Sequence, residues 1–337
     1  MILALVGCGS KTDLHVAGAT PSGMDAGERG VDAGRVEPDA GRPPDDAGRG
    51  CAELTASFPR EPPMLVLIID RSGSMRRLFR RWTPMFPSAS RWEVVREILV
   101  GARGGDGLVH STSARIGMST YTTERGECPF IRFVPPARGN AEALRVELES
   151  LSPGGGTPTA EAIRDALARV DDHRRGDEPV SFLVATDGAP GACGPGGGEA
   201  GVVAATREAF AEGVRTYVIG VGDETSAAHL QDVANAGIGV PSGAQFWEGR
   251  SPAHLLAALE QATERAVNCY AVLSEPIADL ARACEIGLWF GDEPFACGDL
   301  VDGYRFPDAR HLELHGAACA ALRAGQPMTL DAPCDVL

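Results

Sequence analysis

The chain has 337 residues, enough for about two domains, and 44% of them are hydrophobic, as in an ordinary globular protein. Its formal net charge is −15 and Lys11 is the only lysine, so nucleic acid and anionic lipid are excluded as partners bound by electrostatics. No stretch is long and apolar enough to span a membrane, and membrane attachment would therefore need a lipid anchor.

The first eight residues end in Leu5-Val6-Gly7-Cys8, which resembles a bacterial lipobox. In a lipobox the cysteine is lipidated and becomes the mature N-terminus. The resemblance therefore implies a lipid anchor at Cys8 and a place in the bacterial cell envelope, in the outer membrane, the periplasm or at the cell surface. The segment lacks a positively charged n-region and its apolar stretch is short. The alternatives are a start further upstream or an ordinary apolar terminus.

Residues 9–50 contain almost no large apolar side chains. The tripeptide Asp-Ala-Gly recurs every seven residues, at 25–27, 32–34, 39–41 and 46–48. A period of seven normally indicates a coiled coil, but no apolar seam accompanies it here. The segment cannot bury enough surface to offset its ordering entropy, so we expect a disordered linker that tethers the folded part.

From Pro62 onward, apolar runs alternate with stretches of helical periodicity. We expect strands at 65–70, 114–121, 128–134, 180–186, 215–221 and 244–247. We expect helices at 91–100, 141–151, 159–170, 201–211, 226–235 and 252–266. Ser90 should cap the first helix, Gly237 should end the fifth and Pro252 should begin the sixth. This order predicts an α/β fold with a doubly wound, mainly parallel, Rossmann-like sheet and helices on both faces.

A buried strand, residues 65–70, ends in an acid, and two hydroxyl side chains follow it. Asp70, Ser72 and Ser74 would therefore lie together at the carboxyl end of the strand, where open α/β sheets bind their ligands. One carboxylate and two neutral hydroxyls form an oxygen donor set of low charge, which suits Mg²⁺ or Mn²⁺.

Two further motifs follow in order, Gly154-Gly-Gly-Thr157-Pro158-Thr159 and Thr186-Asp187-Gly188 after an apolar run. Together with Asp70-x-Ser72-x-Ser74 they resemble the complete metal-ion-dependent adhesion site of von Willebrand factor type A (VWA) domains. The resemblance covers residues 63–268. It implies that the strand at 128–134 is the one antiparallel edge strand, paired with the strand before it.

The resemblance also implies roles for the site residues. Ser72, Ser74 and Thr157 would coordinate Mg²⁺ or Mn²⁺ through their hydroxyls, while Asp70 and Asp187 would hold coordinated waters and orient the serines. One coordination position would remain for a Glu or Asp of an unknown protein ligand. This implies a cation-dependent adhesion or protein-binding module and not an enzyme.

Less specific interpretations stay open for each motif. Ser72, Ser74 and Thr157 could simply cap helices, and Asp187-Gly188 is a common turn dipeptide. For the whole chain, one alternative is a structural VWA scaffold whose metal only stabilises the fold. Another is a metal-dependent hydrolase, but the sequence shows neither a general base nor a Ser-His-Asp set.

The nine cysteines are an odd number, and lipidation of Cys8 would leave eight. An even set along an exported chain suggests four disulfides, and the absence of Cys-x-x-Cys pairs argues against structural zinc. Connectivity does not follow from sequence, so the expected pairs rest on position along the chain: Cys51–Cys269, Cys128–Cys193, Cys284–Cys297 and Cys319–Cys334.

Residues 269–337 differ from the rest of the chain. Short strands near 288–291, 301–306 and 311–315 and a helix at 317–324 predict a small α+β appendage held by disulfides. It resembles the cysteine-bearing tails that follow VWA domains in myxobacterial lipoproteins. His311, His315 and Cys319 have the spacing of metal ligands, but strand alternation should place both histidines on one solvated face, so we expect no metal there.

Overall fold

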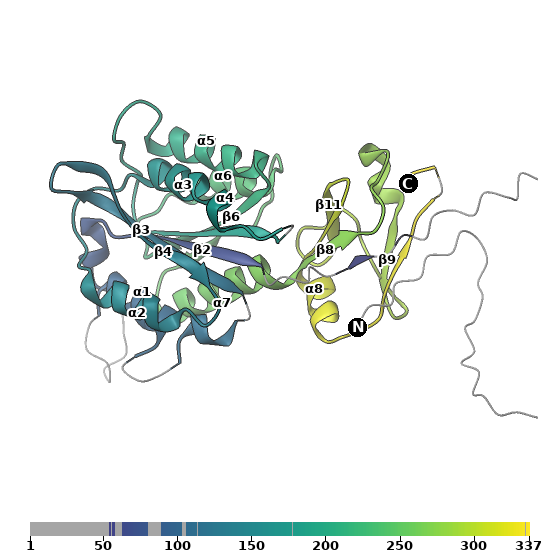
Figure 1. The fold of residues 1–337 in the computed structure, drawn as a ribbon, viewed down its shortest axis with the longest axis horizontal. Helices are drawn as coiled ribbons and strands as arrows, with labels where there is room; N and C mark the ends of the chain where they lie inside the picture. Colours follow the sequence, from purple (N-terminus) through teal and green to yellow (C-terminus); the bar gives the residue numbers. More distant parts are fainter. Residues whose placement is uncertain are drawn as a thin grey trace, which may run out of the picture.

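The computed structural model describes residues 54, 56–57, 63–79, 89–102, 106–112, 114–176, 178–333 and 335–337. The predictions for Cys8, the linker at 9–50, Cys51 and Cys334 lie outside these residues. The described chain forms a larger and a smaller lobe (Figure 1) with separate hydrophobic cores. None of the helices in the described ranges combines the length and apolar character needed to cross a membrane.

The larger lobe contains a six-stranded sheet in the order β4-β3-β2-β5-β6-β7. Its strands are β2 (Met64–Asp70), β3 (Arg115–Glu124), β4 (Glu127–Ala137), β5 (Val180–Thr186), β6 (Val214–Val221) and β7 (Trp247–Gly249). All neighbours pair in parallel except β4, which is antiparallel to β3 at the edge. Every residue of the central strands β2 and β5 is buried, as their mainly apolar sequences predict.

Helices cover both faces of this sheet, which confirms the predicted doubly wound fold. They are α1 (Arg91–Val100), α2 (Ala141–Ser150), α3 (Thr159–Ala168), α4 (Val170–His173), α5 (Gly198–Ala211), α6 (Ala227–Ile238) and α7 (Pro252–Asn268), with short 3-10 turns η1 (Gly73–Arg76) and η2 (Leu108–Ser111). Figure 1 shows α1, α2 and α7 on one face and α3, α5 and α6 on the other.

The helix ends follow local signals with one exception. Ser90 caps α1 in a capping box with Glu93, and Pro252 is the first residue of α7. Gly237, however, does not end α6, because the helix continues to Ile238 and its C-cap is Gly239, with a φ of 70°. Gly237 is needed inside the helix, since a Cβ there would lie 2.1 Å from the carbonyl oxygen of Thr216.

The smaller lobe contains two antiparallel sheets in the orders β1-β8-β12-β11 and β10-β9-β13. Its elements are β1 (Ala56–Ser57), β8 (Tyr270–Leu273), η3 (Leu280–Glu285), β9 (Gly287–Phe290), β10 (Glu293–Phe295), β11 (Tyr304–Asp308), β12 (His311–Leu314), α8 (Gly316–Arg323) and β13 (Met328–Asp331). Leu54 and β1 precede the larger lobe in sequence but belong to the smaller core. The larger lobe is thus inserted between two neighbouring strands of the smaller one.

Three disulfides lie within the described residues, and they correct the expected connectivity. Cys128–Cys193 and Cys284–Cys297 form as expected. Cys269 pairs with Cys319, so the expected pairs Cys51–Cys269 and Cys319–Cys334 are wrong. The reason is tertiary: β12 runs beside the end of α7, where the Leu314 amide donates to the Cys269 carbonyl, and this brings α8 against Cys269.

A buried cluster of charges joins the two lobes. Glu313 of β12 is 3% exposed, and its Oε2 lies 3.1 Å from Nε of Arg215 in β6 and 2.7 Å from Nη2 of Arg305. His315 is also buried, with Nδ1 2.6 Å from Nη2 of Arg265 in α7. The expected solvated position is therefore wrong for His315, because this end of β12 packs against the larger lobe, whereas the His311 side chain is still 30% exposed.

This cluster predicts sensitivity to acid. Burial, together with the positive charge of Arg265, lowers the pKa of His315 to about 4 from its model-peptide value of 6.5, against the opposing effect of Glu313. Between these two values the unfolded chain binds more protons than the folded one, so stability falls as pH falls. We expect His315 to contribute a loss of about 2 kcal/mol between pH 7 and 5. Urea denaturation of the wild type and of His315→Gln at both pH values measures this contribution as the difference between their pH dependences. Equal pH dependence of the two proteins would contradict the assignment.

Candidate functional site

Three loops meet at the carboxyl end of the central strands. They are residues 71–74 after β2, the threonine loop 154–158 before α3, and residues 187–197 after β5. The Gly73 amide donates to the Gly155 carbonyl at 3.0 Å, and the Gly191 amide donates to the Thr157 carbonyl at 2.8 Å. The threonine loop is therefore bonded to both of the others, and the three sequence motifs converge on one place.

The side chains expected to bind metal form one hydrogen-bonded set. Ser72 Oγ lies 2.9 Å from Ser74 Oγ, and Ser74 Oγ donates to Asp187 Oδ1 at 2.6 Å. Asp70 Oδ1 accepts from the Ser72 amide at 2.7 Å, and its Oδ2 accepts from the Thr186 hydroxyl at 2.8 Å. Ser72, Ser74 and Asp187 are thus linked side chain to side chain, and the Asp70 carboxylate joins them through the Ser72 amide. Thr157 is bonded through its carbonyl to Gly191, in the loop that follows Asp187.

The simpler role of these hydroxyls as helix caps finds no support in the geometry. Ser72 stands at the N-cap of η1, but its side chain makes no cap hydrogen bond. The N-cap of α3 is Pro158, and no side chain caps that helix either. The hydroxyls of Ser72 and Ser74 instead contact each other, and the Ser74 hydroxyl also contacts Asp187.

The electrostatics of the site favour a bound cation. Asp70 and Asp187 have no exposed surface. Burial, and next the negative charge of Asp187, raise the pKa of Asp70 to about 6. Among the residues that the structure describes, Arg91 carries the positive charge beside these carboxylates. Its Nη1 lies 2.9 Å from Asp187 Oδ2. Two buried carboxylates and two neutral hydroxyls form an oxygen donor set that fits a hard divalent cation, and Arg91 offsets only part of the negative charge of the carboxylates.

Sequence reasoning placed Arg91 only as the start of a helix. The structure shows its side chain 4% exposed, between Asp187 and the acidic turn after β6, where Asp223 lies 3.3 Å and Glu224 3.4 Å away. The sequence carried one signal for this role. A positive side chain at the first residue of a helix opposes the helix dipole, so an arginine there needs nearby acids.

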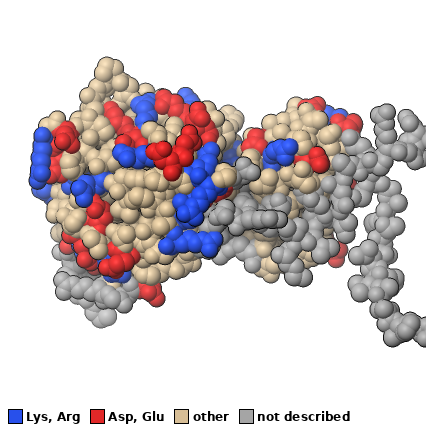
Figure 2. Space-filling model, viewed as in Figure 1, with Lys and Arg blue, Asp and Glu red and all other residues tan. Residues whose placement is uncertain are grey.

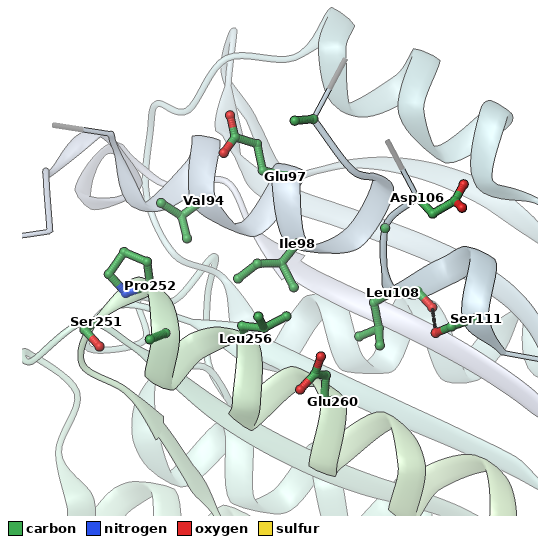
Figure 3. A pocket seen from close by; sticks show the side chains of 13 residues that line it. Val94, Glu97, Ile98, Asp106, Leu108, Ser111, Ser251, Pro252, Leu256 and Glu260 are labelled. Carbon is green, nitrogen blue, oxygen red and sulfur yellow. Dashed lines mark hydrogen bonds between the residues drawn. The ribbon is translucent and has the colours of Figure 1, made fainter. Parts of the chain in front are cut away.

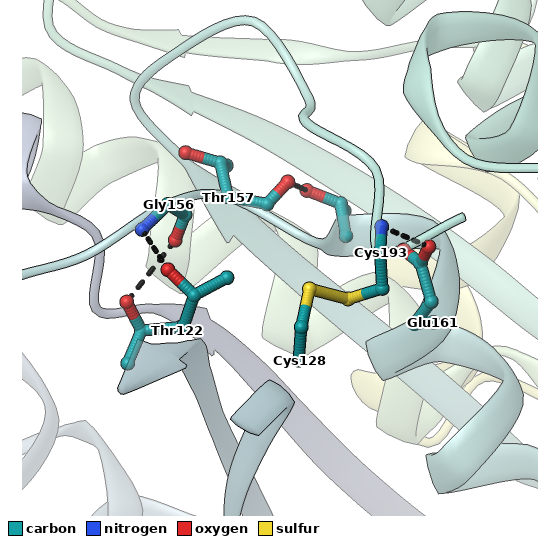
Figure 4. Close-up of a disulfide and its surroundings, with 8 residues drawn as sticks. Thr122, Cys128, Gly156, Thr157, Glu161 and Cys193 are labelled. Atoms are coloured by element: carbon teal, nitrogen blue, oxygen red, sulfur yellow. Dashed lines mark hydrogen bonds between the residues drawn. A yellow bond between two sulfur atoms is a disulfide. The ribbon is translucent and has the colours of Figure 1, made fainter. Parts of the chain in front are cut away.

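The threonine loop is held by the β3–β4 hairpin. The Gly156 amide donates to Thr123 Oγ1 at 2.7 Å, and Thr122 Oγ1 donates to the Gly156 carbonyl at 3.1 Å (Figure 4). Gly155 has a φ of 73°, and a Cβ there would lie 1.9 Å from the Thr123 carbonyl oxygen. Only glycine allows this close approach, so the loop and the hairpin have a fixed relation.

The Cys128–Cys193 disulfide ties the same two sides of the site together. Cys128 lies in β4, and Cys193 lies in the loop that follows Asp187. The Cys193 amide also donates to Glu161 Oε1 of α3 at 2.8 Å (Figure 4). The threonine loop is therefore enclosed between two segments that are covalently joined.

A larger cavity, of about 730 Å³, lies between α1 and α7 and includes none of the five expected ligands (Figure 3). Val94, Ile98 and Leu256 are among its apolar lining residues, and Glu97 and Glu260 also line it. In the part of the chain that the structure describes, no group of three or more His, Cys, Asp or Glu side chains could hold a metal ion.

Part of the chain matches a known protein family. Residues 65–241, just over half of the chain, match the family model of the von Willebrand factor type A domain. No curated protein matches the chain.

Similar solved structures have low sequence identity. BatB from Bacteroides thetaiotaomicron is 18% identical, with a TM-score of 0.42, over 60% of this chain and 98% of that one. Manganese-loaded TRAP from Plasmodium vivax is 15% identical, with a TM-score of 0.42, over 70% and 89%. Proximal thread matrix protein 1 from the mussel byssus, described with a zinc-occupied metal-ion-dependent adhesion site, is 15% identical, with a TM-score of 0.40, over 60% and 48%.

Proposed function

Because the chain belongs to the von Willebrand factor type A domain family, we propose that it binds another protein through a divalent cation. The residues that would hold Mg²⁺ or Mn²⁺ are Asp70, Ser72, Ser74, Thr157 and Asp187. The observation that carries the proposal is the hydrogen-bonded set of two serines and two buried carboxylates at the meeting point of three loops.

The side chains of this site fit a role in binding. A cation held there would supply an electrophilic position that accepts a carboxylate of the partner. Ser72 and Ser74 contribute neutral oxygens, and Arg91 already balances part of the charge of Asp187. The donor set therefore leaves much of the positive charge of the cation uncompensated, which favours an incoming Glu or Asp.

Disulfides support a place outside the cytoplasm. The described residues contain three, and such bonds form and persist in oxidising compartments. Together with the resemblance of residues 5–8 to a lipobox, they lead us to propose the bacterial cell envelope as the location of the protein. A lipid anchor at Cys8 stays a prediction, because that residue lies outside the described ranges.

Calorimetric titration with Mg²⁺ tests the metal site. We expect Asp187→Asn to lower the affinity for Mg²⁺ at least about tenfold, because it removes one of two carboxylates from the site. The matched control is Asp223→Asn, which also faces Arg91 but is half exposed and is not an expected ligand. Equal Mg²⁺ affinity of Asp187→Asn and the wild type would contradict the assignment, provided that circular dichroism shows both folded.

A pull-down from outer-membrane extract tests the binding role. A partner retained by the wild type in Mg²⁺, and lost both on chelation and in Asp187→Asn, would support the proposal. Retention that is indifferent to both would contradict it, and the site would then serve only the stability of the fold.

A further inference from the structure

A second cavity, of about 590 Å³, opens beside the candidate metal site. Its wall includes Gly154 and Gly155 of the threonine loop and Arg71, the residue that follows Asp70. Its other side is formed by the turn of the β3–β4 hairpin and the start of β4. The cavity therefore extends from the three metal-site loops toward the edge of the sheet, and we name it the arginine groove.

The arginine groove is basic although the chain is strongly acidic. Four arginines and one glutamate line it: Arg71, Arg76, Arg125, Arg132 and Glu124. Figure 2 shows basic side chains at the outer edge of the larger lobe, on the side where the β3–β4 hairpin turns in Figure 1. In a chain of net charge −15, this local excess of positive charge marks a surface suited to anions.

Two of these arginines are occupied by contacts within the protein. Arg71 is 5% exposed, and it donates to Glu124 Oε2 at 2.8 Å and to the Ser152 carbonyl at 2.9 Å. Arg132 Nε donates to Glu147 Oε1 of α2 at 2.7 Å. These pairs give the groove fixed walls.

The other two arginines are available to a ligand. Arg76 uses Nε to donate to the Pro153 carbonyl at 2.7 Å, which orients the side chain, and none of the described acidic residues forms an ion pair with it. Arg125 is 83% exposed, and its contact is a 3.6 Å approach to Glu124, which Arg71 already engages. The terminal nitrogens of Arg76 can therefore take a carboxylate in a bidentate pair.

We propose that the arginine groove holds an extended acidic segment of a protein partner. The first carboxylate of the segment completes the candidate metal centre, and the carboxylates that follow it meet Arg76 and Arg125. The proposal rests on the proposed function and adds the class of partner, a run of several acidic residues in place of a single one. Phe130, Leu151 and Pro153 also line the groove and suit the aliphatic parts of glutamate side chains.

Two synthetic peptides test the proposal by fluorescence anisotropy with the full chain. One carries a single glutamate among glycines, and the other has the same length and four consecutive glutamates. In Mg²⁺ we expect the four-glutamate peptide to bind about tenfold more tightly, and Arg76→Gln/Arg125→Gln to remove this advantage without changing the affinity for the single-glutamate peptide. Arg138→Gln is the control, since it is exposed and follows β4 at the opposite end of the strand.

The outcomes separate the groove from the metal site. The proposed groove is wrong if the four-glutamate peptide still binds more tightly than the single-glutamate peptide to the Arg76→Gln/Arg125→Gln variant. It is also wrong if Arg138→Gln removes this difference equally. No preference between the peptides in Mg²⁺ would also overturn it, while metal-dependent binding of both would keep the proposed function. If the peptide binds in chelator and Arg76→Gln/Arg125→Gln still weakens that binding, the groove is supported and the metal-dependent function is contradicted. If dextran sulfate in chelator displaces the four-glutamate peptide as effectively as an excess of the same peptide does, the groove accepts any polyanion. This result would overturn the assignment to acidic polypeptide.

Discussion

Replacing Glu313 with glutamine should lower the free energy of unfolding by about 3 to 5 kcal/mol, because it removes a buried carboxylate that Arg215 and Arg305 share. Glu313 is 3% exposed and lies within 3.1 Å of Arg215 and 2.7 Å of Arg305. Burial alone would raise the pKa of this carboxyl, but the positive charges of Arg215 and Arg305 outweigh it and hold the pKa well below its usual range. The stability from this carboxylate is present above its unfolded pKa and is lost as pH falls below it.

Urea denaturation at neutral pH measures the effect. The control is Glu285→Gln, which removes an exposed ion pair with Arg282 in the same lobe and should leave the midpoint almost unchanged. A Glu313→Gln protein as stable as the wild type would show that the buried arginines find other partners. It would also refute the view that this cluster fixes the contact between the lobes.

Removing the Cys128–Cys193 disulfide is the second large change, with effects on both stability and metal affinity. The bond closes a loop of 65 residues, so the double variant Cys128→Ser/Cys193→Ser should lose about 4 kcal/mol through the added entropy of the unfolded chain. It should also bind Mg²⁺ several-fold more weakly, because the hairpin and the loop after β5 no longer enclose Thr157 at a fixed distance.

A second disulfide provides the matched control. Cys284→Ser/Cys297→Ser opens a loop of 13 residues in the smaller lobe and should cost about 3 kcal/mol, with no change in Mg²⁺ affinity. Urea denaturation and calorimetric titration separate the two effects. If both double variants alter Mg²⁺ affinity alike, the disulfide beside the threonine loop has no special part in shaping the site.

Features encoded by neighbouring residues could be predicted from the sequence. The bounds of α1 match because Ser90 and Glu93 form a local capping box, and those of β5 match because a buried apolar run has clear ends. The place of the loop after β2 at the carboxyl edge of the sheet also followed from the pattern of a buried strand. The approach of the other two loops to it was implied by the resemblance to VWA domains.

Features that depend on packing could not be predicted. The pairing of Cys269 with Cys319, the burial of His315 and the place of Gly237 inside α6 all arise where distant segments meet. Arg91 was missed as a site residue because no local sequence pattern at the start of a helix indicates which distant residue, here Asp187, the side chain will contact. The sequence therefore indicated where the site lies but not which groups surround it.

The insertion of the larger lobe between β1 and β8 has a mechanical consequence. The chain enters that lobe after Ser57 and leaves it before Tyr270, and the two strands beside these points pair with each other, Ala56 with Leu273. Tension applied from residues before Leu54 would therefore act first on the smaller lobe, and it would reach the sheet of the larger lobe through the chain only once β1 had separated from β8.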